Sequence, residues 1–454
     1  MTPNNSLSNF KPQQWFRDEI VKRVYKNAGV LFSGKVIAGL LSLVYVALAA
    51  HALGSSLFGV LVLVNAYTLA IAAVFTFHGR YALVRYATLC LAEKSHPKLM
   101  KLLSFMLLIE LGFGILAISL AALLVPFAAE QFSWPAEAQP VIVLYSLACV
   151  SMMHSMPAGV LYVFRRFKLL SLQQTMGPSV RLLGAIIAYA LGAGLDGFLL
   201  AWLAGAIAEA AAQWFFGLRE LSRQGLLRGL LVWPKGISRQ HAGILHFIFV
   251  NKLNISLEEL GNRATPLAVG WILGPAATGL YDVALRIGMV LAQPVLIIGQ
   301  TIYPELSQLV ADKQNRSLSR VVFHTGLIAT MMGSLVLLML GVFGDSILVW
   351  IGGAGFDAAY NVLILIALAR TIHLFGFPLG SALVAYGRPG TVLKVNLAAT
   401  LLLLPVLLGL LKAFGLNGAG FHAVALALVT VSTMTLVFRQ HSASHSSAEH
   451  QSGQ

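Results

Sequence analysis

A short segment bounded by two glycines occurs twice in this chain of 454 residues. The first copy is Leu53-Gly-Ser-Ser-Leu-Phe-Gly59 and the second is Leu273-Gly-Pro-Ala-Ala-Thr-Gly279, so the matching glycines are 220 positions apart. Each copy lies between two long apolar segments, and glycine tolerates the backbone angles that a tight turn requires. We therefore expect each glycine pair to form a turn between two membrane helices, in a chain made of two copies of one unit, as is typical of transporters.

The composition supports a membrane location. Apolar residues make up 58% of the chain and charged residues only 11%, whereas soluble proteins carry about 25% charged residues. A membrane-spanning helix needs roughly 20 apolar residues, and this criterion predicts twelve spans. They are 28–51, 57–79, 102–127, 139–163, 176–194, 197–218, 242–272, 277–303, 321–344, 359–386, 392–411 and 417–438.

The distribution of Lys and Arg over the loops predicts the orientation. One set of alternate loops, together with both chain ends, holds 24 of these residues, and the other set holds only Lys412. An excess of positive charge marks the cytoplasmic side, so both termini are predicted to be cytoplasmic. The net charge of +14 therefore reflects membrane topology and does not indicate nucleic-acid binding.

These patterns divide the chain into five parts. We predict an amphipathic cytoplasmic segment at 1–27, a six-helix lobe at 28–218, a basic cytoplasmic linker at 219–241, a second six-helix lobe at 242–439 and a tail at 440–454. The linker is interpreted as a segment lying on the surface, with a regulatory site as the alternative. The tail is rich in Ser and His, a composition that indicates disorder.

Charged residues inside the predicted spans are the main indication of a functional site. Each costs about 2.5 kcal/mol or more at mid-membrane, so their number indicates a polar cavity between the helices. There are eleven: Lys35, Glu110, Arg181, Glu209, Lys252, Glu258, Glu259, Arg263, Asp282, Arg286 and Arg370.

The spacing of these charges separates the candidates. Asp282 and Arg286 are four residues apart, as are Glu259 and Arg263, so each pair faces one side of a helix. Such a pair can be a structural ion pair or part of a binding site. Lys252 and Arg370 have no acid on the same turn, and they are the better candidates to line a cavity.

The remaining charges leave alternatives open. Lys35 and Arg181 lie close to the cytoplasmic edge, where they can reach the lipid headgroups or form the mouth of the cavity. Glu110 and Glu209 are interpreted as partners of intramembrane cations, with a protonatable ion-coupling site as the alternative, and Asp282 is a third coupling candidate. The histidines show no ligand spacing, so no metal and no cofactor is expected.

Four segments resemble a known group of proteins. They are Glu258–Ile287, Ala52–Gly59, Gly159–Lys168 and Tyr303–Ser307. In order and spacing they are similar to polysaccharide-biosynthesis flippases of the O-antigen type, within the multidrug/oligosaccharidyl-lipid/polysaccharide transporter superfamily. Many relatives carry an Asp immediately before the Arg of the seventh span, where this chain has Asn262, which puts ion coupling at that position in doubt.

The resemblance implies an all-α membrane protein with two homologous six-helix lobes arranged in a V, which alternate between inward-open and outward-open states in the bacterial inner membrane. The implied cargo is an oligosaccharide linked to an isoprenoid pyrophosphate of the undecaprenyl type, used for surface polysaccharide such as lipopolysaccharide. Membrane lipids, a polysaccharide polymerase and the chain-length machinery are the implied partners.

A cavity lined by cations suits such an anionic headgroup, because Arg can bind a pyrophosphate with paired hydrogen bonds. The predicted ligands are Lys252, Arg263, Arg286 and Arg370, with Lys35 and Arg181 as weaker candidates. A cation-coupled exporter of small molecules with the same fold is the first alternative. A membrane polymerase or glycosyltransferase is disfavoured, because the predicted outer loops at 128–138 and 345–358 are short and the sequence shows no catalytic constellation.

Overall fold

The structure, a computed structural model, describes the backbone of residues 19–227, 230, 236–241, 243–300, 303–312 and 314–452. Residues 1–18 of the predicted amphipathic segment and residues 228, 229 and 231–235 of the basic linker lie outside the described residues. In the described part every regular element is a helix, as predicted. Eight helical segments are long and apolar enough to cross a membrane, so the chain is an all-α multi-pass membrane protein.

The first half of the chain contains α2 and the helices that pack around it. Its elements are α2 (Glu19–Phe75), α3 (Arg80–Ala92), α4 (His96–Leu123), α5 (Val125–Gln131), η1 (Ala136–Ala138), α6 (Gln139–Tyr145), η2 (Ser146–Met152), α7 (Ser155–Val163), α8 (Phe167–Ala190) and α9 (Gly194–Arg223). The first two predicted spans both lie on α2, and the fourth is divided among α6, η2 and α7.

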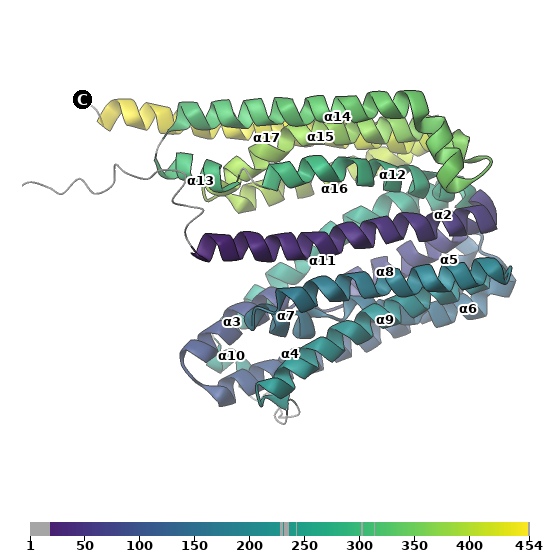
Figure 1. Cartoon of the computed structure of the whole chain (residues 1–454), viewed down its shortest axis with the longest axis horizontal. Helices are drawn as coiled ribbons and strands as arrows, with labels where there is room; N and C mark the ends of the chain where they lie inside the picture. The colour runs from purple at the N-terminus through teal and green to yellow at the C-terminus, as the bar shows by residue number, and fades with distance from the viewer. Residues whose placement is uncertain are drawn as a thin grey trace, which may run out of the picture.

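The second half begins with the short helix α10 (Ile237–Gln240) of the linker. Its other elements are α11 (Ile244–Leu273), α12 (Pro275–Gln300), α13 (Tyr303–Ala311), α14 (Asn315–Gly352), η4 (Phe356–Ala359), α15 (Tyr360–Ala385), α16 (Pro389–Phe414) and α17 (Leu416–Ser452). Figure 1 shows the two halves as separate layers of helices, with the first part of α2 and α11 between them.

The duplicated segments form turns of nearly the same shape. Gly54 interrupts α2 with φ 66° and ψ 175°, and Gly274 separates α11 from α12 with φ 85° and ψ 177°. Because L-residues other than glycine rarely adopt positive φ, these two glycines are required by the backbone. The prediction of two matching turns is confirmed at these positions.

Gly59 and Gly279 have a different role from the one predicted, because neither is a turn residue. They lie within α2 and α12, where the two helices cross. A Cβ atom on Gly59 would overlap the carbonyl of Pro275, and a Cβ atom on Gly279 would overlap the carbonyl of Ser55. Ser55 and Pro275 are themselves 220 positions apart, so the crossing is pseudo-symmetric. We call this contact the glycine crossing.

The lobes also share apolar packing near the glycine crossing. Phe58 of α2 and Phe356 of η4 are fully buried, and their ring centroids are 6.3 Å apart. Both belong to one buried apolar cluster that contains residues of both halves. The two lobes are therefore closed against each other at the end that carries the glycine turns.

The helix of the fourth predicted span is broken at Met153 and His154. The segment changes from the 3₁₀ geometry of η2 to α7 at Met153 and His154. Side chains from other helices satisfy the backbone groups that the break frees. The indole of Trp214 donates to the Met153 carbonyl at 2.8 Å, and the carboxylate of Glu110 accepts hydrogen bonds from the amides of Ser155 and Met156.

The tail also differs from its prediction. Helix α17 continues to Ser452, through the segment that the composition predicted to be disordered. Residues 440–452 contain no Gly or Pro that would end a helix, so the helix runs on from the last predicted span.

Candidate functional site

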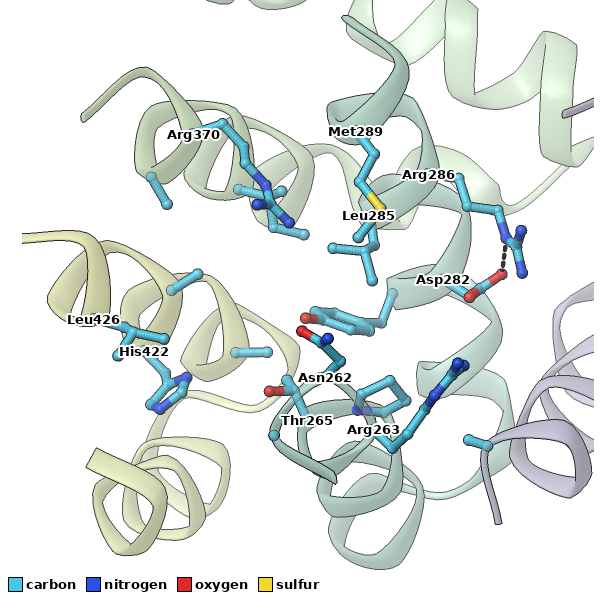
Figure 2. A pocket seen from close by; sticks show the side chains of 18 of the residues that line it. Asn262, Arg263, Thr265, Asp282, Leu285, Arg286, Met289, Arg370, His422 and Leu426 are labelled. Atoms are coloured by element: carbon cyan, nitrogen blue, oxygen red, sulfur yellow. Dashed lines mark hydrogen bonds and ion pairs between the residues drawn. The ribbon is translucent and has the colours of Figure 1, made fainter. Parts of the chain in front are cut away.

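A cavity of about 620 Å³ lies among helices α2, α11, α12, α15 and α17. Its lining includes three of the predicted cationic ligands, Arg263, Arg286 and Arg370, together with the acids Glu259 and Asp282. Figure 2 shows most of these side chains and the helices that carry them. The cavity thus gathers charges from α11, α12 and α15 against a wall supplied by the first half of the chain.

Arg286 is the best-partnered cation of the cavity. Its Nε lies 2.5 Å from a carboxylate oxygen of Asp282, one turn earlier on α12. Its Nη1 donates to the Ser42 hydroxyl of α2 at 2.9 Å. The ion pair considered in the sequence analysis is therefore present, and Arg286 also connects the two halves of the chain.

Arg263 is only loosely paired. Its Nη2 lies 3.7 Å from Glu259, which is longer than a normal charge-assisted hydrogen bond. The Nε of Arg263 is buried and has no hydrogen-bond partner within the described structure. This guanidinium therefore keeps unused donors while its charge is partly offset by Glu259.

Arg370 is the cation of the cavity with the least compensation. In the described part of the chain it forms no ion pair. Tyr281 and His373 line the same cavity, and neither is an acid that would neutralise it. In Figure 2 the Arg370 side chain extends from α15 into the cavity. A guanidinium in this setting favours an anion as its partner.

The other three predicted cations lie elsewhere. Lys252 is not part of the cavity wall; its Nζ donates to the Val74 carbonyl at the end of α2 at 2.6 Å. Arg181 belongs to α8 and donates to the Tyr45 hydroxyl at 2.9 Å. Lys35 is exposed on α2. The position of a cation within a predicted span therefore did not show which face of its helix the cation occupies, and so did not show whether it lines the cavity.

Glu110 and Glu209, the two acids interpreted as partners of intramembrane cations, form no ion pair within the described structure. Glu110 is fully buried and holds the first amides of α7, where a negative charge is also favoured by the helix dipole. Glu209 packs against Gly177 of α8. Arg181 lies one turn further along α8 and donates its hydrogen bond to Tyr45. Among the described residues no group of His, Cys, Asp and Glu is arranged to hold a metal.

Several uncharged site residues were not identified from the sequence. Ser42 and Tyr45 contact the arginines from α2, and Asn65 lines the cavity while accepting a hydrogen bond from Tyr145 at 3.0 Å. The duplication offers one signal, because Ser42 corresponds to Asn262 at the 220-residue offset, and Asn262 also lines the cavity.

Two known proteins are similar to this chain in sequence. It is 26% identical over 357 residues to an inner membrane protein YghQ of Escherichia coli, a match that covers 79% of this chain and 100% of that protein. It is 25% identical over 160 residues to a probable low-salt glycan biosynthesis flippase, Agl15, of Haloferax volcanii, covering 35% of this chain and 33% of the flippase. No protein-family model matches the sequence.

Solved structures show the fold. An inward-facing multidrug resistance transporter of the MATE family and MOP superfamily has a TM-score of 0.70, with 14% identity, 90% of this chain covered and 96% of that chain. An outward-facing transporter of the same description has a TM-score of 0.60, with 16% identity and coverages of 95% and 98%. The lipid II flippase MurJ, in an inward closed conformation, has a TM-score of 0.64, with 13% identity and coverages of 90% and 87%.

Proposed function

We propose that this chain, which has the fold of the multidrug/oligosaccharidyl-lipid/polysaccharide transporters, is a flippase that moves a lipid-linked oligosaccharide across the cytoplasmic membrane by alternating access. The observation that carries the proposal is the cavity at the boundary between the halves, in which Arg263, Arg286 and Arg370 come together. The named relatives are transporters and flippases rather than enzymes, and we assign no catalytic role.

The charges of the cavity favour an anionic headgroup. Asp282 offsets Arg286 and Glu259 partly offsets Arg263, whereas Arg370 pairs with no acid among the described residues. A pyrophosphate presents several oxygens to guanidinium groups, and charge-assisted hydrogen bonds of this kind are roughly twice as strong as neutral ones. The cavity volume of about 620 Å³ lies in the range of roughly 300–1,000 Å³ that is usual for small-molecule sites, which suits the pyrophosphate and the first sugar.

The direction of loading follows from the closed end of the lobes. The glycine crossing closes the end that the positive-inside distribution assigns to the outside. The higher TM-score to the inward-facing transporter than to the outward-facing one supports the same assignment. The headgroup would therefore enter from the cytoplasm, while the isoprenoid chain stays in the bilayer. An inner-membrane location with cytoplasmic termini, and delivery to a polymerase with its chain-length machinery, belong to this proposal.

A deletion strain tests the proposal. We expect lipid-linked glycan units to be made and to remain on the cytoplasmic leaflet, with surface polysaccharide lost. Plasmid-borne wild type should restore export, and Arg370→Ala at equal protein level should not. A strain that lacks the lipid-linked unit altogether would point to an enzyme, and normal surface polysaccharide would remove the proposed cargo.

A cation-coupled exporter of small molecules is the second candidate. The multidrug transporters among the structural neighbours, the buried carboxylate of Glu110 and the half-buried carboxylate of Glu209 are the observations that favour it. If this candidate is correct, the deletion strain should become sensitive to cationic drugs while its surface polysaccharide stays intact.

A further inference from the structure

A chain of hydrogen bonds crosses the boundary between the lobes next to the cavity. Starting in the second half, Asp282 pairs with Arg286 at 2.5 Å, and Arg286 donates to the Ser42 hydroxyl at 2.9 Å. Ser42 donates to the Tyr45 hydroxyl at 2.9 Å, and Arg181 of α8 donates to the same oxygen at 2.9 Å. We call this chain the interlobe relay. It connects α12 with α2 and α8.

Tyr45 is the point at which the relay passes from Ser42 of α2 to Arg181 of α8. Its side chain is 3% exposed, and its ring packs edge-on against Trp202 with centroids 5.6 Å apart. The Arg181 guanidinium lies 5.2 Å from the centre of the same ring. The hydroxyl oxygen accepts from both Ser42 and Arg181, which uses the full acceptor capacity of a phenol. The position of this oxygen is therefore set by Ser42 and Arg181 of the first half, and Ser42 connects it to Arg286 of the second half.

The relay also lies close to the glycine crossing. Arg286 is seven residues beyond Gly279 on α12, which corresponds to about 10 Å along the helix. When the lobes separate at the glycine crossing, α2 and α12 must part, and the bond between Arg286 and Ser42 must break. The relay therefore exists only while this end of the molecule is closed.

We propose that Tyr45, acting through Ser42 and Arg181, holds the lobes in the closed arrangement, and that an anion bound in the cavity opens them by taking Arg286 from Ser42. The second half of this statement rests on the proposed function, since it needs an anionic headgroup. A phosphate oxygen is a charged acceptor and a hydroxyl is a neutral one, so the guanidinium prefers the phosphate. Loss of the Arg286–Ser42 bond removes the hydrogen bond that joins Ser42 and Tyr45 to α12.

The chain supplies a closely matched control on the same helix. Tyr67 of α2 is also buried and packs edge-on against a tryptophan, Trp134, at 5.5 Å. Its hydroxyl donates to the Ala121 carbonyl of α4 at 2.7 Å, which lies in the same lobe. Tyr45→Phe and Tyr67→Phe therefore each remove one buried hydroxyl while the ring is kept, and only the first removes the partner that positions Ser42, the residue that contacts Arg286 of the other lobe.

Cross-linking at the glycine crossing measures the closed population. Cysteines replace Ser55 and Thr278 in a protein that also carries Cys90→Ala and Cys149→Ala, and a short bifunctional thiol reagent joins them in proteoliposomes. We expect Tyr45→Phe to lower the cross-linking rate by about tenfold, as the loss of one hydrogen bond to a charged group allows. Tyr67→Phe should leave the rate unchanged. Ser42→Ala cuts the relay one bond away and should act like Tyr45→Phe, which covers the case in which Tyr45→Phe does not fold.

Inorganic pyrophosphate tests the release step, with sodium chloride at equal ionic strength as its control. Pyrophosphate should lower the cross-linking rate of the parent protein and have no further effect on Tyr45→Phe, a difference that a purely structural tyrosine would not produce. If the cargo is not a lipid-linked sugar, the export assay fails while this response persists. Equal rates for the parent and Tyr45→Phe, or a parent that does not respond to pyrophosphate, would overturn the proposal.

Discussion

The two copies of the duplicated unit have the same turn but different chemistry. The backbone angles at Gly54 and Gly274 nearly coincide, and the glycines beyond them meet in one pseudo-symmetric contact. At the same offset of 220 positions, however, Asp282 and Arg286 correspond to Val62 and Ala66, and Glu259 and Arg263 correspond to Gly39 and Leu43. The shared residues shape the fold, and the charges that differ shape the cavity.

The first copy contributes to the cavity in another way. It supplies uncharged residues: Ser42 accepts a hydrogen bond from Arg286 of the second copy, and Asn65 lines the cavity beside the charged residues. The two copies have similar backbones, but one supplies charged side chains and the other supplies uncharged ones. The cavity is therefore asymmetric although the framework around it is pseudo-symmetric. The following substitutions exchange residues between the copies or break the part that they share.

The largest effect is expected where the copies are alike. Gly59→Leu places a side chain on the Pro275 backbone, and because backbone cannot rotate away, the cost should reach the upper end of the roughly 1–3 kcal/mol typical of overpacking. We expect export to fall more than tenfold and the closed arrangement to be lost in the cross-linking assay. Gly112→Leu, at a helical glycine whose surroundings are open, is the control. Normal export by Gly59→Leu would show that the glycine crossing does not need to close.

The ion pair on α12 tests the difference between the copies. Arg286→Ala gives the second copy the residue that the first copy has at this position. The substitution leaves the carboxylate of Asp282 unpaired, and the Asp282 side chain is only 10% exposed. We expect a loss of about 2 kcal/mol of stability, below the 3–5 kcal/mol of fully buried pairs because Arg286 is partly exposed. Thermal unfolding in detergent measures it. Adding Asp282→Val should restore most of the stability but not export, whereas recovery of export would make the pair purely structural.

Arg370 tests the same difference without an ion pair. Its counterpart in the first copy is Val150, so Arg370→Val removes the charge and keeps an apolar side chain. We expect export to fall about tenfold, in line with one lost hydrogen bond between charged groups, with an unchanged melting temperature. Arg370→Lys should recover part of the activity, because it keeps the charge but not the planar donor pair. Full export by Arg370→Val would place anion binding elsewhere.

The smallest effect is expected at Lys252, which corresponds to Phe32. Its ammonium caps the Val74 carbonyl at the end of α2, so Lys252→Met should cost about 1 kcal/mol of stability and leave pyrophosphate affinity unchanged. Lys35→Met, at an exposed site, should change neither. A clear loss of pyrophosphate binding in Lys252→Met would return this lysine to the set of ligands predicted from the sequence.

The sequence predicted the features whose free-energy cost restricts which residues can occur at a position. It did not predict the features that carry no such restriction. Apolar length predicted the helices, and the cost of intramembrane charge singled out Arg263, Arg286 and Arg370, which line the cavity. The break at Met153 was missed because it depends on Glu110 and Trp214, which other helices bring to it. Ser42 and Tyr45 were missed because a lone hydroxyl in an apolar span is common and carries no distinctive pattern.

The glycine crossing has the form of an isologous interface, in which one surface patch meets a second copy of itself across a two-fold axis. Gly59 meets the segment that contains Pro275, and Gly279 meets the segment that contains Ser55. Everything that this contact requires is therefore present in either half. Two halves made as separate polypeptides would therefore each carry the complementary segments that this contact pairs.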